Sequence, residues 1–395
     1  MTRRRVAIVG GGIGGLVTAL CLAKEDFAVD IFEQADVIEE VGAGIQLSPN
    51  CTGVLHALGL EPQLRQFACL PAATEIRDWR RGQLLASTAL GQTAIDKYGA
   101  PYYHLHRADL MRALVTTAAT LPNIGVHTHS RVSHIEALAQ GVRFVANHDE
   151  LEADALIGAD GIHSSVRQFL FGSDHARFTG NIAWRALVPA VRLPQDLVAP
   201  VTTAWWGPHR HFVHYFVRGG ELLNCVGVVE KRGWETESWT EPGDHDEIKA
   251  DFKGWHPTVE TIVDQLDEST LFKWALFDRA PMRHWSKGRI TLLGDACHPT
   301  LPFMAQGAAM AIEDAAVLAH LMAKTDDIPK ALGQYETARQ KRTARIQRAS
   351  RRNATIFHLS GPGAWLRNQF AQTAGDNVMD WLYRYNPLTE AFSKR

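Results

Sequence analysis

The N-terminal stretch from Val6 to Glu33 decides the fold: Val6-Ala-Ile-Val9, Gly10-Gly-Gly-Ile-Gly-Gly15, an apolar run to Ala23, then Val29-Asp-Ile-Phe32-Glu33. This is G-x-G-x-x-G between a β-branched strand and a helix, the context in which the pattern predicts a dinucleotide site. The first glycine permits a tight turn, the second a close approach to a pyrophosphate, and the third close packing of helix on strand. The pyrophosphate would lie on the free N–H groups of the helix start, and Glu33 has the spacing of a carboxylate that binds an adenosine ribose.

A secretory signal or membrane anchor is the alternative interpretation of this stretch. Arg3 to Arg5 are followed by eighteen uncharged residues, as in such a segment. Five glycines lie inside the run, however, and they weaken any membrane helix. Glu33 would also have no role. We therefore favour dinucleotide binding, because strand, helix and acidic terminus are all present.

The composition is that of an ordinary globular chain. Its 395 residues suggest two domains or one large domain with an inserted layer, and 46% of them are hydrophobic and 21% charged. A net charge of −2 favours neither nucleic acid nor an anionic membrane as a partner. With no other long apolar span, we expect a soluble cytoplasmic protein. We expect no disulfide framework and no metal site, because the five cysteines are widely separated and lack a C-x-x-C pair: Cys21, Cys51, Cys69, Cys225 and Cys297.

The middle of the chain returns to strands of a parallel sheet after a long excursion. Val41 to Asn50 is rich in glycine and leads into an apolar helical pattern, and Arg107 stands near the start of another helix. Arg107 can bind a phosphate, although the residues alone favour a solvated or salt-bridged arginine. Strand patterns follow from 124 to 160, and the last ends in Asp160-Gly161, like a buried parallel strand whose carboxyl end faces a ligand. The nucleotide-binding domain is therefore predicted to be discontinuous.

Residues 180 to about 275 predict a second, antiparallel sheet. Short β-rich runs at 182–189, 202–206, 211–217 and 222–230 are separated by turns of the Gly-Pro and Gly-Gly type. Alternation along the third run places His211 and Tyr215 on one face, about 13 Å apart. Such a pair can hold and deprotonate a phenol. The residues alone favour a simpler interpretation, a hydrogen-bonded pair at an interface.

A third informative stretch runs from 289 to 319. A strand at 290–293 is followed by Gly294-Asp295, a loop stiffened by two prolines, and a helix from about Ala308. Asp295 at the strand end can accept a ribose or ribitol hydroxyl, and the helix start after Gly307 offers unpaired N–H groups to a developing anion. We assign no catalytic role to the neighbouring Cys297 or His298.

The C-terminal part predicts helices. Tyr335 to Arg352 is strongly basic, and we interpret its charges as a solvated face because the whole chain is nearly neutral; a membrane or nucleic-acid surface is the alternative. The aromatic tail around Trp381 and Tyr385 is expected to pack on the body of the protein or on a second subunit. A homodimer is therefore one assembly to consider.

Taken in order, the motifs Gly10-x-Gly12-x-x-Gly15 with Glu33, Asp160-Gly161, and Gly294-Asp295 followed by a helix resemble those of the group A flavoprotein aromatic hydroxylases, related to para-hydroxybenzoate hydroxylase. The resemblance covers nearly the whole chain. Within the group the chain is most similar to salicylate hydroxylase, 3-hydroxybenzoate 6-hydroxylase and 6-hydroxynicotinate 3-monooxygenase. Four segments carry that similarity: His106-Arg-Ala-Asp-Leu110, Gly158-Ala-Asp-Gly-Ile-His-Ser164, Gly294-Asp-Ala-Cys-His-Pro299 and Ala305-Gln-Gly-Ala-Ala-Met-Ala-Ile-Glu-Asp314.

The resemblance implies roles for individual residues. Asp295 would bind the FAD ribitol, Gly307 and Ala308 would face the flavin pyrimidine ring, and Asp160 would lie near the flavin and the route of NADH or NADPH. His211 and Tyr215 would be the catalytic and substrate-binding pair, which reverses the preference from the residues alone. The implied cofactor-binding set is Gly10, Gly12, Gly14, Gly15, Glu33, Gln34, Gln46, Arg107, Val132 (through its backbone, to the adenine), Asp160, Gly294, Asp295, Gly307 and Ala308.

Three departures from the relatives bear on the substrate. Pro302 stands where 3-hydroxybenzoate hydroxylases have a glutamine that contacts substrate. Phe303 and Gln46 stand where the hydroxynicotinate enzyme has histidines. We include Pro302 and Phe303 among the substrate residues, and the changes favour a benzenoid ring over a pyridine.

The resemblance implies an α/β fold: a discontinuous Rossmann-like FAD-binding domain (1–75, 100–178 and 280–325), an antiparallel β-sheet substrate domain (76–99 and 179–279) and a C-terminal helical region (326–395). It also implies an FAD-dependent monooxygenase that hydroxylates a phenolic aromatic acid of the hydroxybenzoate or salicylate type through a flavin C4a-hydroperoxide. NADH or NADPH would be a transient co-substrate, since only one G-x-G-x-x-G is present, and the partners would be a small aromatic substrate and O₂. A hydroxypyridine carboxylate hydroxylase, another flavoenzyme of the fold such as an epoxidase, and a non-catalytic FAD-fold binding protein are the alternatives.

Overall fold

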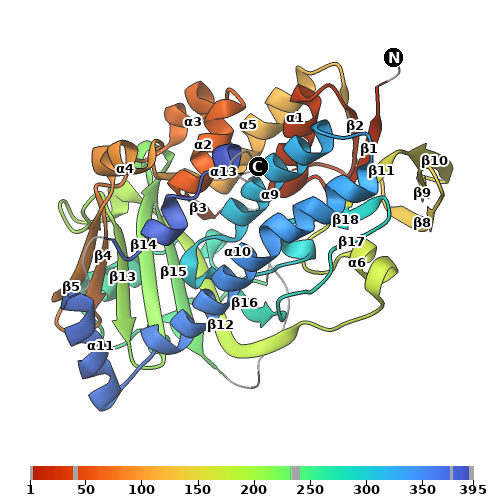
Figure 1. The fold of residues 1–395 in the computed structure, drawn as a ribbon. Helices are drawn as coiled ribbons and strands as arrows, with labels where there is room; N and C mark the ends of the chain where they lie inside the picture. Colours follow the sequence, from red (N-terminus) through yellow and green to blue (C-terminus); the bar gives the residue numbers. More distant parts are fainter. Residues whose placement is uncertain (1–2, 39–42, 232, 234–240, 374–376, 391–395) are drawn as a thin grey trace.

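The structure is a computed structural model that describes residues 3–38, 43–231, 233, 241–373 and 377–390. Two large sheets lie side by side, and the long helix α10 (Ile328–Phe357) runs across both (Figure 1). Val41 and Gly42 of the glycine-rich loop and part of the predicted C-terminal region lie outside the described residues. The mixed α/β class predicted from the sequence is confirmed.

The six-stranded sheet holds the glycine motif. It is parallel except for its edge strand β17, and its order is β17-β18-β11-β1-β2-β7. β1 and β11 are buried β-branched or apolar runs, as expected for central strands covered on both faces. Because β11 and β18 lie far from β1 in the sequence, at residues 155–158 and 290–292, the sheet is discontinuous in sequence, as predicted. The strand bounds are β1 Arg5–Val9, β2 Ala28–Phe32, β7 Ile124–His127, β11 Ala155–Gly158, β17 Ser286–Lys287 and β18 Ile290–Leu292.

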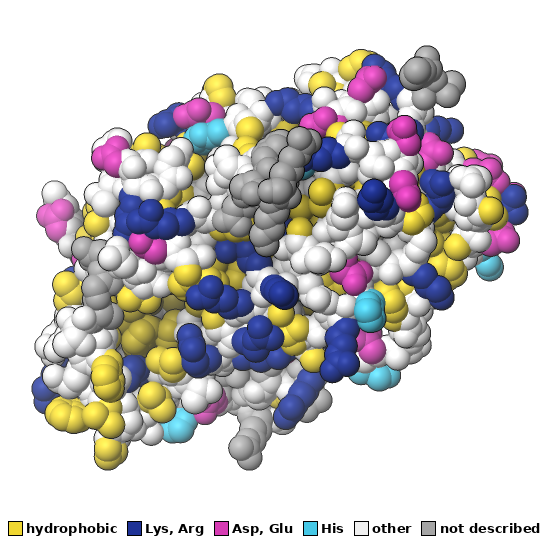
Figure 2. Space-filling view, in the orientation of Figure 1, with side chains coloured by type: hydrophobic (Ala, Val, Ile, Leu, Met, Phe, Trp, Pro, Cys, Tyr) yellow, Lys and Arg dark blue, Asp and Glu magenta, His cyan; other side chains and the backbone are white. Residues whose placement is uncertain are grey.

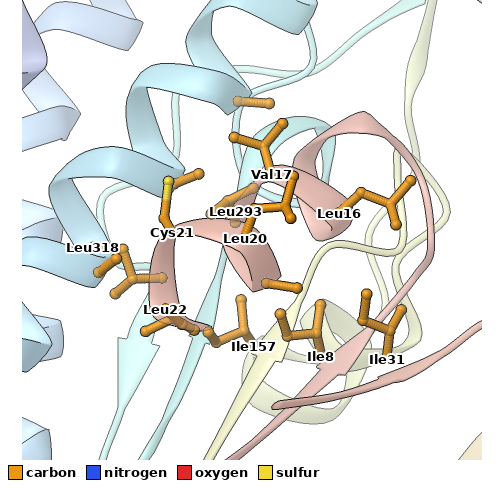
Figure 3. Close-up of a cluster of buried hydrophobic side chains, with 14 of the residues drawn as sticks. Ile8, Leu16, Val17, Leu20, Cys21, Leu22, Ile31, Ile157, Leu293 and Leu318 are labelled. Carbon is orange, nitrogen blue, oxygen red and sulfur yellow. The ribbon is translucent and has the colours of Figure 1, made fainter. Parts of the chain in front are cut away.

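Helix α1 (Ile13–Lys24) packs between this sheet and helix α9 (Gly307–Ala323). Figure 3 shows its apolar side chains lying between those of the strands and those of α9. Leu16, Val17 and Leu20 are almost completely buried there, against Ile8 and Ile157 of the sheet. The N-terminus of α1, where the glycines lie, is thereby fixed against the carboxyl ends of the strands.

The seven-stranded sheet has the order β16-β12-β15-β14-β13-β4-β5. Its pairs are antiparallel, as predicted, with the exception of β13, which is parallel to β4. The sequence patterns missed β16 and also missed helices α7 and α8, which cover the outer face around Trp184 and Phe212. The bounds are β4 Ala73–Asp78, β5 Leu84–Ala89, β12 Arg177–Pro189, β13 Thr202–Gly207, β14 Arg210–Val217, β15 Leu222–Glu230, β16 Phe272–Asp278, α7 His245–Asp251 and α8 Pro257–Asp264. The division of the chain into domains stays a prediction, although β4 already begins before residue 76.

The remaining elements surround these sheets. β8 (Val132–Ala137), β9 (Val142–Ala146) and β10 (Asp149–Ala153) form a three-stranded sheet in which β10 was not predicted, and β3 (Gly44–Leu47) pairs with β6 (Tyr103–His106). The helices are α2 Pro49–Ala57, α3 Glu61–Phe67, α4 Gly91–Tyr98, α5 Arg107–Ala119, α6 Ser165–Phe171, α10 Ile328–Phe357, α11 Gly361–Thr373, α12 Asp380–Tyr383 and α13 Pro387–Glu390.

A buried ion cluster joins α9 to α10. Arg339 of α10 is completely buried and donates from Nε to Asp314 Oδ1 at 2.7 Å and from Nη2 to Glu313 Oε2 at 2.6 Å. Arg342 pairs with the same Glu313 at 2.7 Å. Burial alone would raise the pKa of both carboxyls, but the neighbouring cations, with His298 beside Asp314, outweigh it and hold each pKa below its usual value. We refer to Glu313, Asp314, Arg339 and Arg342 as the ion cluster.

The interpretation of the basic helix as a solvated face is therefore wrong in part. Figure 2 shows Lys and Arg side chains gathered over the region where α10 lies in Figure 1. Several of them nonetheless have internal partners: Arg342 belongs to the ion cluster, Arg351 pairs with Asp278, and Arg345 lies 4.0 Å over the Trp381 ring. Sequence periodicity could not reveal these partners, because they are distant in the chain.

The aromatic tail packs on the body of the same chain. Leu382 and Tyr383 are buried beside Tyr102, and the Tyr385 ring lies 3.9 Å from the Arg342 guanidinium. Across the described ranges, no helix is long and apolar enough to cross a membrane. Over the same part of the chain, no group of three or more His, Cys, Asp or Glu side chains is placed to hold a metal ion.

Replacing Arg339 by Met is expected to destabilise the protein by about 3–5 kcal/mol at pH 7, because two buried carboxylates lose their shared cation. Chemical denaturation followed by circular dichroism measures this loss. Both carboxyls have lowered pKa values in the folded protein, so the cluster stabilises it above their unfolded pKa of about 4 and loses that effect as the pH falls further. The difference between wild type and variant should therefore narrow in acid.

The matched control is Arg348→Met, which removes an exposed arginine from the same helix. It should change the free energy of unfolding by less than about 0.5 kcal/mol. Equal stability of the two variants at pH 7 would contradict the role of the cluster.

Candidate active site

One cavity of about 820 Å³ connects the glycine motif with the inner face of the seven-stranded sheet. Its first half is lined by Gly12, Gly14, Arg107, Asp295 and the start of α9. Its second half is lined by strands β12 to β16 and by the C-terminal end of α10. The cavity therefore brings together residues from both predicted domains and from the C-terminal helix.

The glycines of the motif have three different environments. Gly10 has φ +106°, and a Cβ added there would lie 2.4 Å from the Ala159 carbonyl oxygen. A Cβ on Gly15 would lie 1.9 Å from the Gly10 carbonyl oxygen, because helix and strand are so close. A Cβ on Gly12 would meet no atom within 4 Å, so here the backbone borders open space. The arrangement fits a pyrophosphate beside Gly12, where α1 begins with unpaired N–H groups.

Glu33 closes the loop that carries the motif. Its Oε2 accepts a hydrogen bond from the Gly11 N–H at 2.7 Å, and its Oε1 accepts one from the Ala35 N–H at 2.9 Å. Each carboxylate oxygen keeps a further lone pair, so a ribose hydroxyl can still donate to it. Within the described residues, Glu33, Gln34 and Val132 are not among those lining the cavity, and their predicted contacts with the adenosine half of FAD stay predictions.

Asp160 has a structural role that its sequence position did not reveal. Its Oδ2 accepts hydrogen bonds from the backbone N–H groups of Ser165 and Val166 and from the Ser165 hydroxyl, at the start of α6. Its Oδ1 is buried and has no hydrogen-bond partner in the part of the chain that the structure describes. Ala159 and Gly161 line the cavity on either side. Asp160 thus shapes the edge of the cavity as a helix cap.

Arg107 and Asp295 carry opposite charges into the first half of the cavity. Burial lowers the pKa of Arg107, and Asp295 partly opposes that shift. The pKa of Asp295 is raised, because the effect of burial outweighs the opposing effects of His298 and Arg107. The carboxylate nevertheless borders the cavity. A group that donates hydrogen bonds, such as a ribitol hydroxyl, would favour the charged carboxylate.

The loop before α9 is held in place by the ion cluster. Gly294 has φ +63°, and its N–H donates to Asp314 Oδ2 at 3.2 Å. His298 contacts the same oxygen at 2.5 Å. Gly307 and Ala308 then begin α9 and line the cavity, so the first N–H groups of this helix lie at its wall. These features fit the roles that the resemblance implies for Asp295, Gly307 and Ala308, which would hold FAD.

His211 and Tyr215 lie on the inner face of β14, as strand alternation predicts. Both are buried and line the cavity, whereas Phe212 between them belongs to the core on the other side. The His211 ring lies 5.1 Å from Phe303 and 5.4 Å from Phe357. Its pKa is well below the usual value, first because of burial and second because of His358. The His211 imidazole is therefore neutral at pH 7 and lies in an apolar part of the cavity.

Tyr215 keeps its proton. Burial raises its pKa, and a hydrogen bond with Gln46 only partly opposes this effect. Gln46 also accepts a hydrogen bond from the Tyr102 hydroxyl at 2.7 Å, and it lines the cavity. At neutral pH, Tyr215 can thus donate a hydrogen bond to a bound molecule, but it cannot remove a proton from one. The neighbouring Pro302 and Phe303 line the cavity as well.

Sequence reasoning missed several residues of the second half. Arg185 lies with its guanidinium 5.1 Å from the Trp274 ring, and Trp206 stacks on Phe357 at 4.5 Å. His358 follows α10 and contacts His211. The alternation of β12 offered a weak signal for Arg185, a charged residue within an apolar run. No local pattern pointed to Phe357 or His358, because they meet β14 only through the packing of α10.

Known proteins resemble this chain over nearly its full length. A model of the family described as FAD binding domain matches residues 3–350. The 3-amino-4-hydroxybenzoate 2-monooxygenase of Streptomyces platensis is 41% identical over 390 residues, which cover 97% of this chain and 96% of the relative. The 6-hydroxynicotinate 3-monooxygenase of Bordetella bronchiseptica is 37% identical, over 98% of this chain and 96% of the relative.

A solved structure agrees with this relationship. It is the Klebsiella pneumoniae protein HpxO complexed with FAD and uric acid, which superposes with a TM-score of 0.85 at 27% identity and covers 97% of this chain and 96% of its own. These matches agree with the glycine motif, the loop at Asp295 and the cavity that both line, and they settle the family. The chain belongs to the FAD-binding-domain family and, within it, to the group A flavoprotein hydroxylases, which are FAD-dependent aromatic monooxygenases.

Proposed function

We propose that this monooxygenase hydroxylates a phenolic aromatic acid of the hydroxybenzoate or salicylate type, with NADH or NADPH and O₂ as co-substrates. The observation that carries the proposal is the single cavity that joins the start of α9 to His211 and Tyr215. Its walls around His211 are aromatic: Trp206, Phe303 and Phe357. A flat aromatic ring suits such walls, and an apolar environment keeps water from the reacting atoms.

The polar groups of the second half match the parts of a phenolic acid. Neutral His211 would take the proton from the phenol, which makes the ring electron-rich. Tyr215 would donate a hydrogen bond that holds the substrate oxygen in place. Arg185 also lines the cavity, and its guanidinium would favour a substrate that carries a carboxylate. These roles are complementary, since a base, a donor and a cation each meet a different part of one small molecule.

On the cofactor side, Gly12, Arg107, Asp295 and the first N–H groups of α9 would hold FAD. Bound FAD supplies the electron transfer and oxygen activation, and the protein supplies orientation and exclusion of water. The α9 N-terminus, from Gly307, would stabilise negative charge on the ring that it faces. No second G-x-G-x-x-G occurs in the sequence, which supports a transient visit of the nicotinamide donor.

A hydroxypyridine carboxylate such as 6-hydroxynicotinate is the second candidate substrate. The Bordetella relative supports it, whereas the Streptomyces relative supports a benzenoid acid, and the two are of similar identity. Phe303 and Gln46 favour the benzenoid ring, since they leave fewer ionisable groups around the substrate than histidines would. We therefore place the benzenoid acids first.

A substrate panel should distinguish the two. The FAD-loaded protein is expected to oxidise NADH or NADPH faster in the presence of monohydroxybenzoates or aminohydroxybenzoates than with hydroxynicotinates, because the site is apolar and aromatic. Oxidation of the donor and oxygen-dependent formation of a hydroxylated product are measured together, since uncoupled oxidation alone does not show hydroxylation. Product from hydroxynicotinates alone would favour the second candidate, and no product from any phenolic acid would overturn the proposal.

Replacing His211 by Ala is expected to reduce hydroxylation by about 10²-fold or more while FAD stays bound, because the phenol loses its base. Turnover with the best substrate from the panel, compared with the flavin absorbance of the purified variant, measures both effects.

His175→Ala is the control, since this histidine is exposed between α6 and β12. It should retain wild-type turnover. Wild-type turnover in the His211 variant as well would remove His211 as the base.

A further inference from the structure

A chain of hydrogen-bonded groups leads from His211 to the surface. His211 Nδ1 lies 2.8 Å from His358 Nε2. His358 Nδ1 lies 3.1 Å from Glu230 Oε1. Both histidines are buried, at 3% exposure, whereas the Glu230 side chain is 43% exposed. The chain therefore has one end at the cavity and the other in solvent.

The backbone holds these groups together. The His209 N–H donates to the His358 carbonyl at 3.0 Å, and the Glu230 N–H donates to the His209 carbonyl at 2.9 Å. Arg367 of α11 donates to the carbonyls of Ile356 and Phe357, at the C-terminal end of α10. These backbone hydrogen bonds hold β14, β15 and α10 together at the place where His211, His358 and Glu230 contact one another.

The geometry points to a proton relay in which Glu230 and His358 connect the base His211 with solvent. This inference rests on the proposed function, because it assigns a path to the proton that the substrate phenol loses. Glu230 and His358 touch neither substrate nor cofactor in it, so both are positioning residues that act through His211.

The relay also determines which nitrogen of His211 carries the proton. An ionised Glu230 only accepts hydrogen bonds, so His358 must carry its proton on Nδ1. The His358 Nε2 then has a free lone pair and accepts from Nδ1–H of His211. This leaves Nε2 of His211 unprotonated. His358 contacts only Nδ1 of His211, so Nε2 is available to accept the proton of a phenol in the cavity.

One proton moves at each link, and the balance is complete. His211 Nε2 gains the phenol proton as its Nδ1 proton passes to His358 Nε2, and the His358 Nδ1 proton passes to Glu230, which holds it at the solvent-exposed end as a neutral carboxyl that donates back to His358 Nδ1. No imidazolium remains in the buried site. The reverse movement returns a proton to the product oxygen and restores both tautomers.

The charges around His358 favour this concerted path over a stored positive charge. Burial lowers the pKa of His358 to about 4, with Glu230 opposing the shift and His209 and Arg367 adding to it. Burial would raise the pKa of Glu230, but His209 and His358 hold it below its usual value. His209 is itself exposed and contacts the second Glu230 oxygen at 2.9 Å. At neutral pH the ground state is therefore two neutral imidazoles and one carboxylate.

Glu230→Gln and His358→Phe are the test variants. The amide introduced by the first can donate as well as accept, so it no longer dictates the tautomers, and the phenyl ring introduced by the second keeps the volume but removes both nitrogens. Glu221→Gln is the matched control, because Glu221 is exposed at the turn between β14 and β15, outside the chain of contacts. Flavin absorbance and thermal midpoint confirm that each variant is folded and loaded.

The probe is 4-hydroxy-3-nitrobenzoate, whose phenolate absorbs in the visible, bound to FAD-loaded protein and titrated with pH without any turnover. Wild type and Glu221→Gln should lower the apparent pKa of the bound probe relative to solution. Both test variants should raise it by about one pH unit or more, because His211 would have to keep the proton as a buried imidazolium. With the best phenolic acid from the panel, their kcat at pH 7 should fall about tenfold or more with little change in KM.

The outcomes separate the two proposals. Identical titrations of the bound probe in wild type, Glu230→Gln and His358→Phe would overturn the relay, and so would a wild type that leaves the ionisation of the probe unchanged. A wild type that ionises the probe but hydroxylates no phenolic acid would overturn the proposed function and leave the relay supported.

Discussion

The buried ion cluster between α9 and α10 is the constraint on which the rest of the site depends. One oxygen of Asp314 accepts a hydrogen bond from Arg339, and the other contacts the Gly294 N–H and His298. Glu313 accepts hydrogen bonds from Arg339, from Arg342 and from the side-chain amide of Asn50 at the start of α2. Charges out of water are tolerated only when almost every lone pair is satisfied, so these groups admit one arrangement. That arrangement fixes the loop of Asp295, the first turn of α9 and the direction of α10 together.

The fold was largely readable from local patterns. The glycine motif, Asp160-Gly161 and Gly294-Asp295 each follow a buried strand of the same sheet, and this repeated association predicted a discontinuous nucleotide-binding unit. Alternation along β14 placed His211 and Tyr215 on one face correctly. The parallel pairing of β13 with β4 was not predicted, because the turn signals within 180–275 say nothing of a strand from residues 73–78.

The rest of the site could not be read from local patterns, for a physical reason. The roles of His358 and Arg339 depend on their partners in β14 and α9. These partners are far away in the sequence, and a repeat of 2 or 3.6 residues indicates only which near neighbours share a face. A row of basic residues on a helix usually indicates a solvent-exposed face. Here that prediction was wrong for the arginines whose partners are buried acids. Asp160 shows another limit of local patterns. Its place at the end of a strand predicted a ligand contact, which stays a prediction, and gave no sign of the hydrogen bonds that it accepts at the start of α6.

Helix α10 has a mechanical consequence beyond its contacts. His358 follows Arg339 by 19 positions in the sequence, and at 1.5 Å per residue this corresponds to about 29 Å of rigid helix. One end of the helix is fixed beside the loop of Asp295 through the ion cluster, and the other forms a wall of the cavity. A single inserted or deleted residue between them would turn the far end by about 100°. Exchanged side chains can therefore reshape the cavity wall without moving this helix, whereas a change in its length would displace that wall.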